Sequence, residues 1–95
     1  LSWAGAAIAS GEAGGWRPEV VHLHDWQAAL VPVYLRERGA GLRERGGPGS
    51  LITVHNIAFH GLAAAEKLSR LRLPASGFTP DGFEYWGRIS ALKAG

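Results

Sequence analysis

The chain has 95 residues, a formal net charge of +2 and no cysteine. This length is that of one small domain, and the lack of cysteine excludes disulfides and thiolate metal sites. The densest basic segment, Arg36 to Arg45, is interrupted by Glu37 and Glu44, which argues against a nucleic-acid-binding arm. Because no apolar run approaches the roughly 20 residues that a membrane-spanning helix needs, we expect neither nucleic acid nor a membrane as a partner.

The first part of the chain predicts a helix, a loop and a strand. Leu1 to Ser10 is rich in alanine and is followed by Gly11, which is typical of the end of a helix. The glycines and the proline between Gly11 and Pro18 predict a loop. Glu19 to His24 has apolar residues on both faces, the pattern of a parallel strand that is covered on both sides.

The next segment predicts a helix with a break. Apolar residues have helical spacing from Trp26 as far as Arg38, and Asp25 is the expected N-cap. Pro32 lies inside this helix and removes one of its backbone hydrogen bonds. We therefore expect a kink at Pro32, or a first turn that is separate from the rest.

A second strand follows and completes a βαβ unit. Ala40 to Ser50 predicts a connector, and the β-branched residues of Leu51 to Asn56 predict a strand. Two strands joined by a helix imply a parallel sheet over about residues 19–56. The remaining residues, 57–95, predict an irregular loop with short helices at about 63–71 and 86–94.

Polar side chains end both predicted strands. His24 and Asp25 follow the first, and His55 and Asn56 follow the second. Open α/β sheets bind ligands beyond the carboxyl ends of their strands, and neighbouring strands lie about 5 Å apart, so these groups are expected to converge. The plainer alternatives are a core position for His24 and a capping role for Asp25. His22 alternates onto the opposite face from Leu23, and we expect it to be a core histidine bonded to the backbone.

A metal site is a less favoured alternative. His22 and His24, with His55 or His60 and with Asp25, would supply the nitrogen and oxygen ligands that zinc takes. However, residues 22 and 24 are about 7 Å apart along one face of the strand, and only the later one reaches its end. We therefore expect no metal.

Three segments of the chain resemble one enzyme family. Arg17 to Leu30 resembles the PDVVHAHDWQ segment of bacterial glycogen synthases and plant starch synthases. Thr53 to Phe59 resembles their T(V/I)HN(L/I)A(Y/F)QG motif, and Phe78 to Gly95 resembles their DGLEFYGKISFLKAG segment. The segments occur in the family's order, with similar gaps, and cover nearly the whole chain.

The resemblance implies an α/β fold and a glycosyltransferase. The family's enzymes have two Rossmann-like domains that face each other across a cleft, the GT-B architecture. They are cytoplasmic, need no cofactor and transfer glucose, with retention, from ADP-glucose to the non-reducing end of an α-1,4-glucan such as glycogen. Residues 1–95 would then be an incomplete fragment of the N-terminal, acceptor-side domain, inactive by itself because the donor-binding half is missing. The alternative is a glucan-binding or structural α/β module without catalysis.

The resemblance also implies roles for individual residues. In the family, the histidine that matches His55 lies against the transferred glucose, and the aspartate that matches Asp25 lines the active site, so both are expected to be catalytic. His60 departs from the family, which usually has glutamine there, and Ala91 replaces a usual phenylalanine. The residues expected to bind substrate are Asn56, His24, Glu84 and His60.

Overall fold

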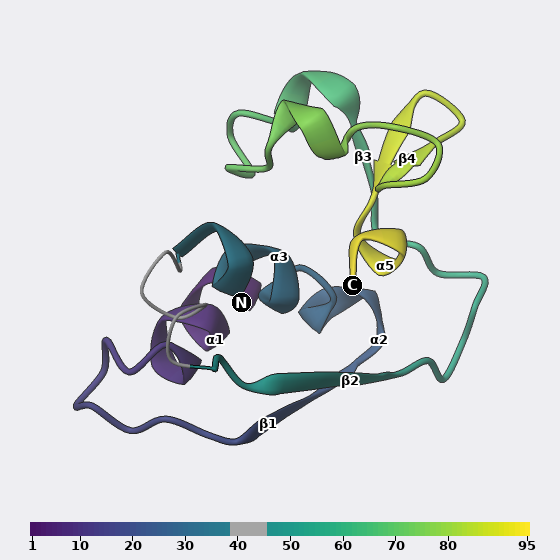
Figure 1. Ribbon diagram of the computed structural model, residues 1–95. Helices are drawn as coiled ribbons and strands as arrows, with labels where there is room; N and C mark the ends of the chain where they lie inside the picture. The colour runs from purple at the N-terminus through teal and green to yellow at the C-terminus, as the bar shows by residue number, and fades with distance from the viewer. Residues whose placement is uncertain (39–45) are drawn as a thin grey trace.

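The computed structural model describes residues 1–38 and 46–95, and it contains two small sheets and several short helices (Figure 1). In chain order the elements are α1 (Ser2–Ala9), β1 (Val20–His24), α2 (Asp25–Ala28), α3 (Val31–Arg38), β2 (Gly49–Thr53), β3 (Leu62–Ala64), the 3-10 turns η1 (Ala65–Lys67) and η2 (Ala75–Gly77), β4 (Glu84–Tyr85), β5 (Arg88–Ser90) and α5 (Ala91–Ala94). The first sheet is the pair β1–β2, and the second has the order β3-β5-β4. Helices α1 and α3 pack on each other along one face of the first sheet.

The first sheet confirms the predicted parallel pairing. Val20 is opposite Gly49 and His24 is opposite Thr53, with continuous register between them. The second strand begins and ends earlier than expected, so that His55 lies beyond β2 rather than in it. The predicted connector from position 40 to 50 lies mainly outside the described residues.

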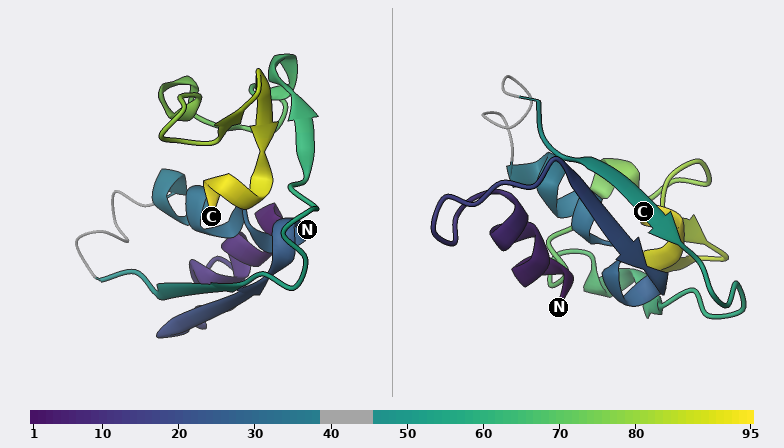
Figure 2. Two further views of the ribbon diagram at one scale, coloured as in Figure 1. Left: turned by 90° about the vertical axis from the view of Figure 1, so that its right-hand side faces the viewer. Right: turned by 90° about the horizontal axis from the view of Figure 1, so that it is seen from below.

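Only one face of this sheet is covered by the described residues. Leu23 is buried on the helix side, with 4% of its surface exposed, whereas Val20 and Leu51 are 62% and 56% exposed. The right-hand view of Figure 2 looks onto the sheet from the side opposite α1 and α3. The prediction that both faces are covered is therefore wrong within the described part of the chain. The two helices α1 and α3 form a single layer, and that layer covers one face only.

The helical segment after β1 is broken at the place that proline chemistry predicts. Helix α2 ends at Ala28, and α3 begins at Val31 with Pro32 as its second residue. Proline is tolerated in the first turn of a helix because an N–H there has no partner within the helix. The expected separate first turn is confirmed.

The second sheet was not predicted. Its strands β4 and β5 form a hairpin whose two turn residues, Trp86 and Gly87, have φ values of 51° and 74°. Positive φ at both positions is the signature of a tight hairpin turn that matches the twist of the strands. Ile89 in β5 is 1% exposed and Phe83 is 4% exposed, and both belong to the core cluster. The expected helix at 63–71 is reduced to the 3-10 turn η1, and that at 86–94 is reduced to α5 at its end.

Tyr34 of α3 contacts both α1 and the segment between β3 and β4. Its hydroxyl donates to the Leu71 carbonyl at 2.8 Å, and its ring meets the edge of Trp3 at 5.1 Å. Burial raises the pKa of the Tyr34 phenol above its ordinary value of 10.0.

None of the helices in the described ranges has the length and hydropathy to cross a membrane.

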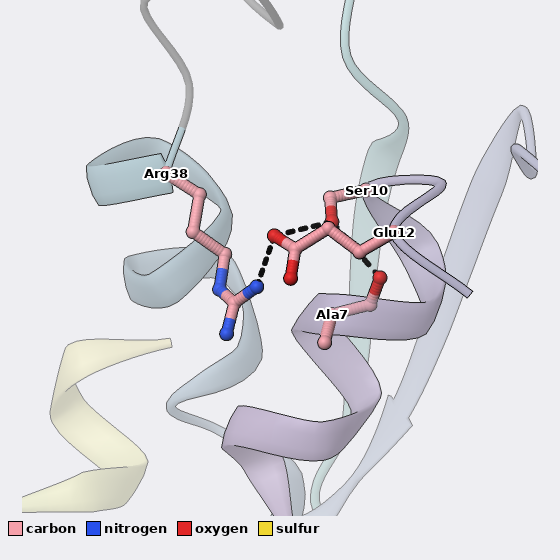
Figure 3. Close-up of polar contacts among 4 residues, drawn as sticks. All are labelled: Ala7, Ser10, Glu12 and Arg38. Atoms are coloured by element: carbon pink, nitrogen blue, oxygen red, sulfur yellow. Dashed lines mark hydrogen bonds and ion pairs between the residues drawn. The ribbon is translucent and has the colours of Figure 1, made fainter. Parts of the chain in front are cut away.

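An ion pair closes the end of the α1–α3 layer (Figure 3). The Arg38 guanidinium contacts the Glu12 carboxylate, and its carbon lies 3.9 Å from the centre of the Trp3 ring. The Ser10 hydroxyl lies 2.9 Å from the Ala7 carbonyl oxygen and 3.1 Å from Glu12 Oε1. The hydrogen bond from Arg38 holds the pKa of the Glu12 carboxyl below its ordinary value of 4.5.

Replacing Glu12 with glutamine is expected to remove part of the acid sensitivity of the fold. A carboxyl whose pKa is lower in the folded state stabilises the protein above its unfolded value of 4.5, and this contribution is lost as the pH falls through the folded pKa. The free energy of unfolding of the wild type should therefore exceed that of Glu12→Gln at pH 7, and the difference should vanish on acidification. Urea unfolding between pH 7 and pH 3 measures it.

The matched control is Glu66→Gln, because Glu66 has no ion-pair partner among the described residues. This control should show no comparable pH-dependent difference from the wild type. A Glu12→Gln difference that stays constant with pH would show that the pair contributes through packing rather than charge.

Candidate functional site

The two strands of the first sheet end beside each other, and the residues that follow them form the candidate site. In the register of the pair, His24 ends β1 opposite Thr53, which ends β2. Asp25 begins α2, and His55 and Asn56 follow β2. His24 and Asp25 both contact His55 there, so the predicted convergence is confirmed in geometry for these three residues.

A row of three histidine rings crosses the edge. His24 Nδ1 lies 3.0 Å from His55 Nε2, a hydrogen bond between residues 31 positions apart. The ring centres of His22 and His24 are 4.4 Å apart, and His22 Nε2 lies 2.8 Å from Thr53 Oγ1. All three histidines are exposed. The prediction that His22 is a core residue bonded to the backbone is wrong, because its face of the sheet is the uncovered one.

Asp25 holds the backbone of His55. Its Oδ1 accepts a hydrogen bond from the His55 N–H at 2.7 Å. The φ of 55° puts Asp25 in the left-handed region, which costs a residue with a side chain about 1–3 kcal/mol. The carboxylate is thus turned toward the end of β2, and it does not cap α2. The helix starts at Asp25 itself, with His24 at the N-cap position, so the predicted capping role is wrong.

Asn56 shapes the loop that leaves the site. Its side-chain Oδ1 accepts from the Ala58 N–H at 3.0 Å, and its carbonyl accepts from the Phe59 N–H at 3.2 Å. This is a turn in which a short amide side chain replaces a backbone acceptor. The turn redirects the chain immediately after His55.

The other two predicted site residues lie at the second sheet. The His60 ring stacks on Tyr85 with ring centres 4.6 Å apart, and its Nδ1 lies 3.4 Å from the Ser90 hydroxyl. Glu84 is in β4, and its Oε1 accepts from the Gly87 N–H at 2.5 Å in the hairpin turn. The described contacts therefore bring His24, Asp25 and His55 together and leave His60 and Glu84 outside that cluster.

Several of the nitrogen and oxygen atoms that could bind a metal ion are instead engaged in hydrogen bonds within the cluster. Each of His24 and His55 uses one ring nitrogen for their mutual hydrogen bond, and Asp25 binds a backbone N–H. Within residues 1–38 and 46–95, no group of three or more His, Cys, Asp or Glu residues is arranged to hold a metal ion. The chemistry that this edge offers is proton exchange at imidazole and a nearby carboxylate that stabilises positive charge.

A mainly apolar cavity of about 510 Å³ lies where the loop after Asn56 passes α2 and the second sheet. The rings of Trp26 and Phe59 contribute to its lining, together with the polar side chains of Gln27 and His60. The sequence did not predict this cavity. Its only signal was the presence of an aromatic residue soon after each strand end.

Comparisons with known proteins place the chain in a family. The model of the starch synthase catalytic domain matches residues 1–95. A glycogen synthase of Paracoccus denitrificans is 61% identical over 95 residues, and one of Cereibacter sphaeroides is 54% identical over 96 residues. A glycogen synthase of Yersinia pestis is 50% identical over 95 residues.

Each of these matches covers 100% of this chain but 19% of the relative. The chain therefore spans about a fifth of the length of the curated relatives that it matches. The family match and the identity over the full chain agree with each other and with the three motifs. The chain belongs to the starch synthase catalytic domain family.

Proposed function

We propose that the chain is one wall of the active-site cleft in a retaining glucosyltransferase of GT-B architecture, as part of its N-terminal, acceptor-side domain. The enzyme transfers glucose from ADP-glucose to the non-reducing end of an α-1,4-glucan, acts in the cytoplasm and needs no cofactor. Family membership supports the reaction class. The observation that carries the proposal is the convergence of His24, Asp25 and His55 at the carboxyl ends of parallel strands, where such sheets bind ligands.

The chemistry of glucosyl transfer suits these groups. When the nucleotide diphosphate departs, the sugar acquires oxocarbenium character, and nearby carboxylates and carbonyl oxygens stabilise its positive charge. In this proposal His55 lies against the transferred glucose and Asp25 contributes negative charge to the same edge. Both are catalytic residues of the full-length enzyme.

The remaining proposed contacts are with substrate. His24 presents its Nε2, the ring nitrogen that is not used in the bond to His55. Asn56 lies directly after the catalytic histidine. Glu84 and His60, which belong to the surroundings of the second sheet, would meet the glucan farther from the reacting sugar.

A transfer assay on the full-length enzyme tests the proposal. We expect labelled glucose to pass from ADP-glucose to glycogen, with little transfer from UDP-glucose, and we expect the new linkage to be an α-1,4 bond. The 95-residue chain alone should bind glucan weakly or not at all and should transfer no glucose. If the full-length protein binds glucan but transfers glucose from neither donor, the result would instead support a non-catalytic binding module. Transfer from UDP-glucose alone would overturn the proposed donor.

A further inference from the structure

Two consecutive residues hold His55 at two different points. His24 contacts its ring, with Nδ1 to Nε2 at 3.0 Å, and Asp25 contacts its backbone, with Oδ1 to N at 2.7 Å. The ring planes of His24 and His55 are inclined by 17°, with centres 5.3 Å apart, so the two imidazoles lie nearly parallel. The His55 ring is thus held in one orientation although it is exposed to solvent.

The hydrogen bond between the rings also constrains where the protons are. In an N–H···N bond one nitrogen carries the proton and the other offers a lone pair. If His24 Nδ1 donates, a neutral His55 must carry its own proton on Nδ1. If His55 Nε2 donates, a neutral His55 has a bare Nδ1. The free nitrogen of His55 is therefore Nδ1 in both cases. Whether this nitrogen carries a proton depends on which ring donates in the bond with His24.

Rings that both carry a charge would break this arrangement. Each would then have a proton on both nitrogens, and two N–H groups would face each other. The other described groups at the pair are the His22 ring, 4.4 Å from the His24 ring, the Asp25 carboxylate and the Thr53 hydroxyl. Of these, only Asp25 carries a negative charge, and its Oδ1 is engaged with a backbone N–H.

We propose that His24 is a positioning residue that fixes the orientation of His55 and couples the tautomers of the two rings, so that His55 meets the sugar through Nδ1. This inference rests on the proposed catalytic role of His55, and it replaces the substrate contact proposed for His24 with a positioning role. Substrate contact would use the His24 Nε2, whereas positioning uses the Nδ1. The two nitrogens can be tested separately, because asparagine and glutamine mimic different parts of the imidazole ring.

Three substitutions in the full-length enzyme separate the roles. His24→Asn keeps a polar atom at the location of Nδ1, and His24→Gln places its polar atoms farther out, near the location of Nε2. His24→Leu keeps neither and serves as the apolar reference. We expect His24→Leu and His24→Gln to lower kcat by about 10- to 100-fold with little change in KM, the range known for residues that orient metal-bound histidines. His24→Asn should restore most of the loss.

A second readout does not depend on activity. In enzyme labelled with ¹⁵N-histidine, the Nε2 shift of His55 should differ between the wild type and His24→Leu, and should return toward the wild-type value in His24→Asn. The His55 signals are identified by their absence in His55→Ala. If the wild type transfers no glucose, the proposed function fails, but these shifts still decide whether the pair exists.

Two results would overturn the inference. One is rescue by His24→Gln and not by His24→Asn, accompanied by a higher KM in His24→Leu, because this pattern shows direct contact through Nε2. The other is a His24→Leu enzyme with unchanged kcat and unchanged His55 shifts. Circular dichroism confirms that each variant is folded before it is scored.

Discussion

Replacing His55 with alanine in the full-length enzyme is expected to lower kcat by about 100- to 1000-fold, the usual cost of removing one preorganised polar group from an active site. The substitution removes only the ring, and it keeps the backbone N–H of residue 55 that donates to Asp25 Oδ1. The turn at the strand end should therefore persist. Steady-state rates of glucose transfer at saturating ADP-glucose measure the effect, and binding to immobilised glycogen should be retained.

His22→Ala is the matched control for this experiment. His22 is also an exposed histidine on the open face of the first sheet, but its ring nitrogen bonds the Thr53 hydroxyl rather than His55. Its loss should leave kcat within a small factor of the wild-type value. A His55→Ala enzyme with full kcat would contradict the catalytic role. Lost glycogen binding with normal kcat would indicate that His55 belongs to an acceptor-binding surface.

Replacing Gly61 with alanine is expected to give the largest loss of stability among single-methyl additions at the site. Gly61 has φ of 63°, and an added Cβ would lie 2.4 Å from Trp26 Cε3 and 3.1 Å from the Ala91 Cβ. The left-handed backbone costs about 1–2 kcal/mol for a residue with a side chain, and overpacking adds about 1–3 kcal/mol. We expect a lower free energy of unfolding by about 2–5 kcal/mol, measured by urea unfolding.

Gly87→Ala separates the two causes. Gly87 also has a left-handed backbone, with φ of 74°, but an added Cβ there would meet nothing within 4 Å. Only the backbone cost of about 1–2 kcal/mol should appear. Equal losses in the two variants would show that the Trp26 ring moves aside freely and that contact with it contributes nothing. A larger loss in Gly61→Ala supports a rigid contact between α2 and the loop after the site.

The loop that contains Gly61 also connects the site to α5. The carbonyls of His60 and Gly61 accept hydrogen bonds from the N–H groups of Leu92 and Ala91, at 3.0 and 3.3 Å. The loop that leaves His55 is therefore fixed at its far end on α5. A Gly61→Ala enzyme should lose some activity as well as stability, because displacement of Trp26 moves the residue next to Asp25.

Elements with a local cause were predictable. Leu1 to Ser10 has the composition of a helix and Gly11 ends it, and the structure has α1 over Ser2–Ala9. The separate turn before α3 follows from the chemistry of Pro32 alone. The hairpin was not predictable in this way. Its strands have two and three residues, too few for an alternating pattern, and its turn carries Trp86 where asparagine or aspartate would have been the usual signal.

The three motifs were sufficient to indicate the family, and apolar patterns within short segments were sufficient to predict the two strands and their parallel pairing. The contacts between the side chains at the strand ends could not be predicted in this way. The hydrogen bond between His24 and His55 joins residues 31 positions apart, and it depends on the register of two strands that no local pattern specifies. The left-handed backbone of Asp25 likewise turned an expected helix cap into the group that holds His55.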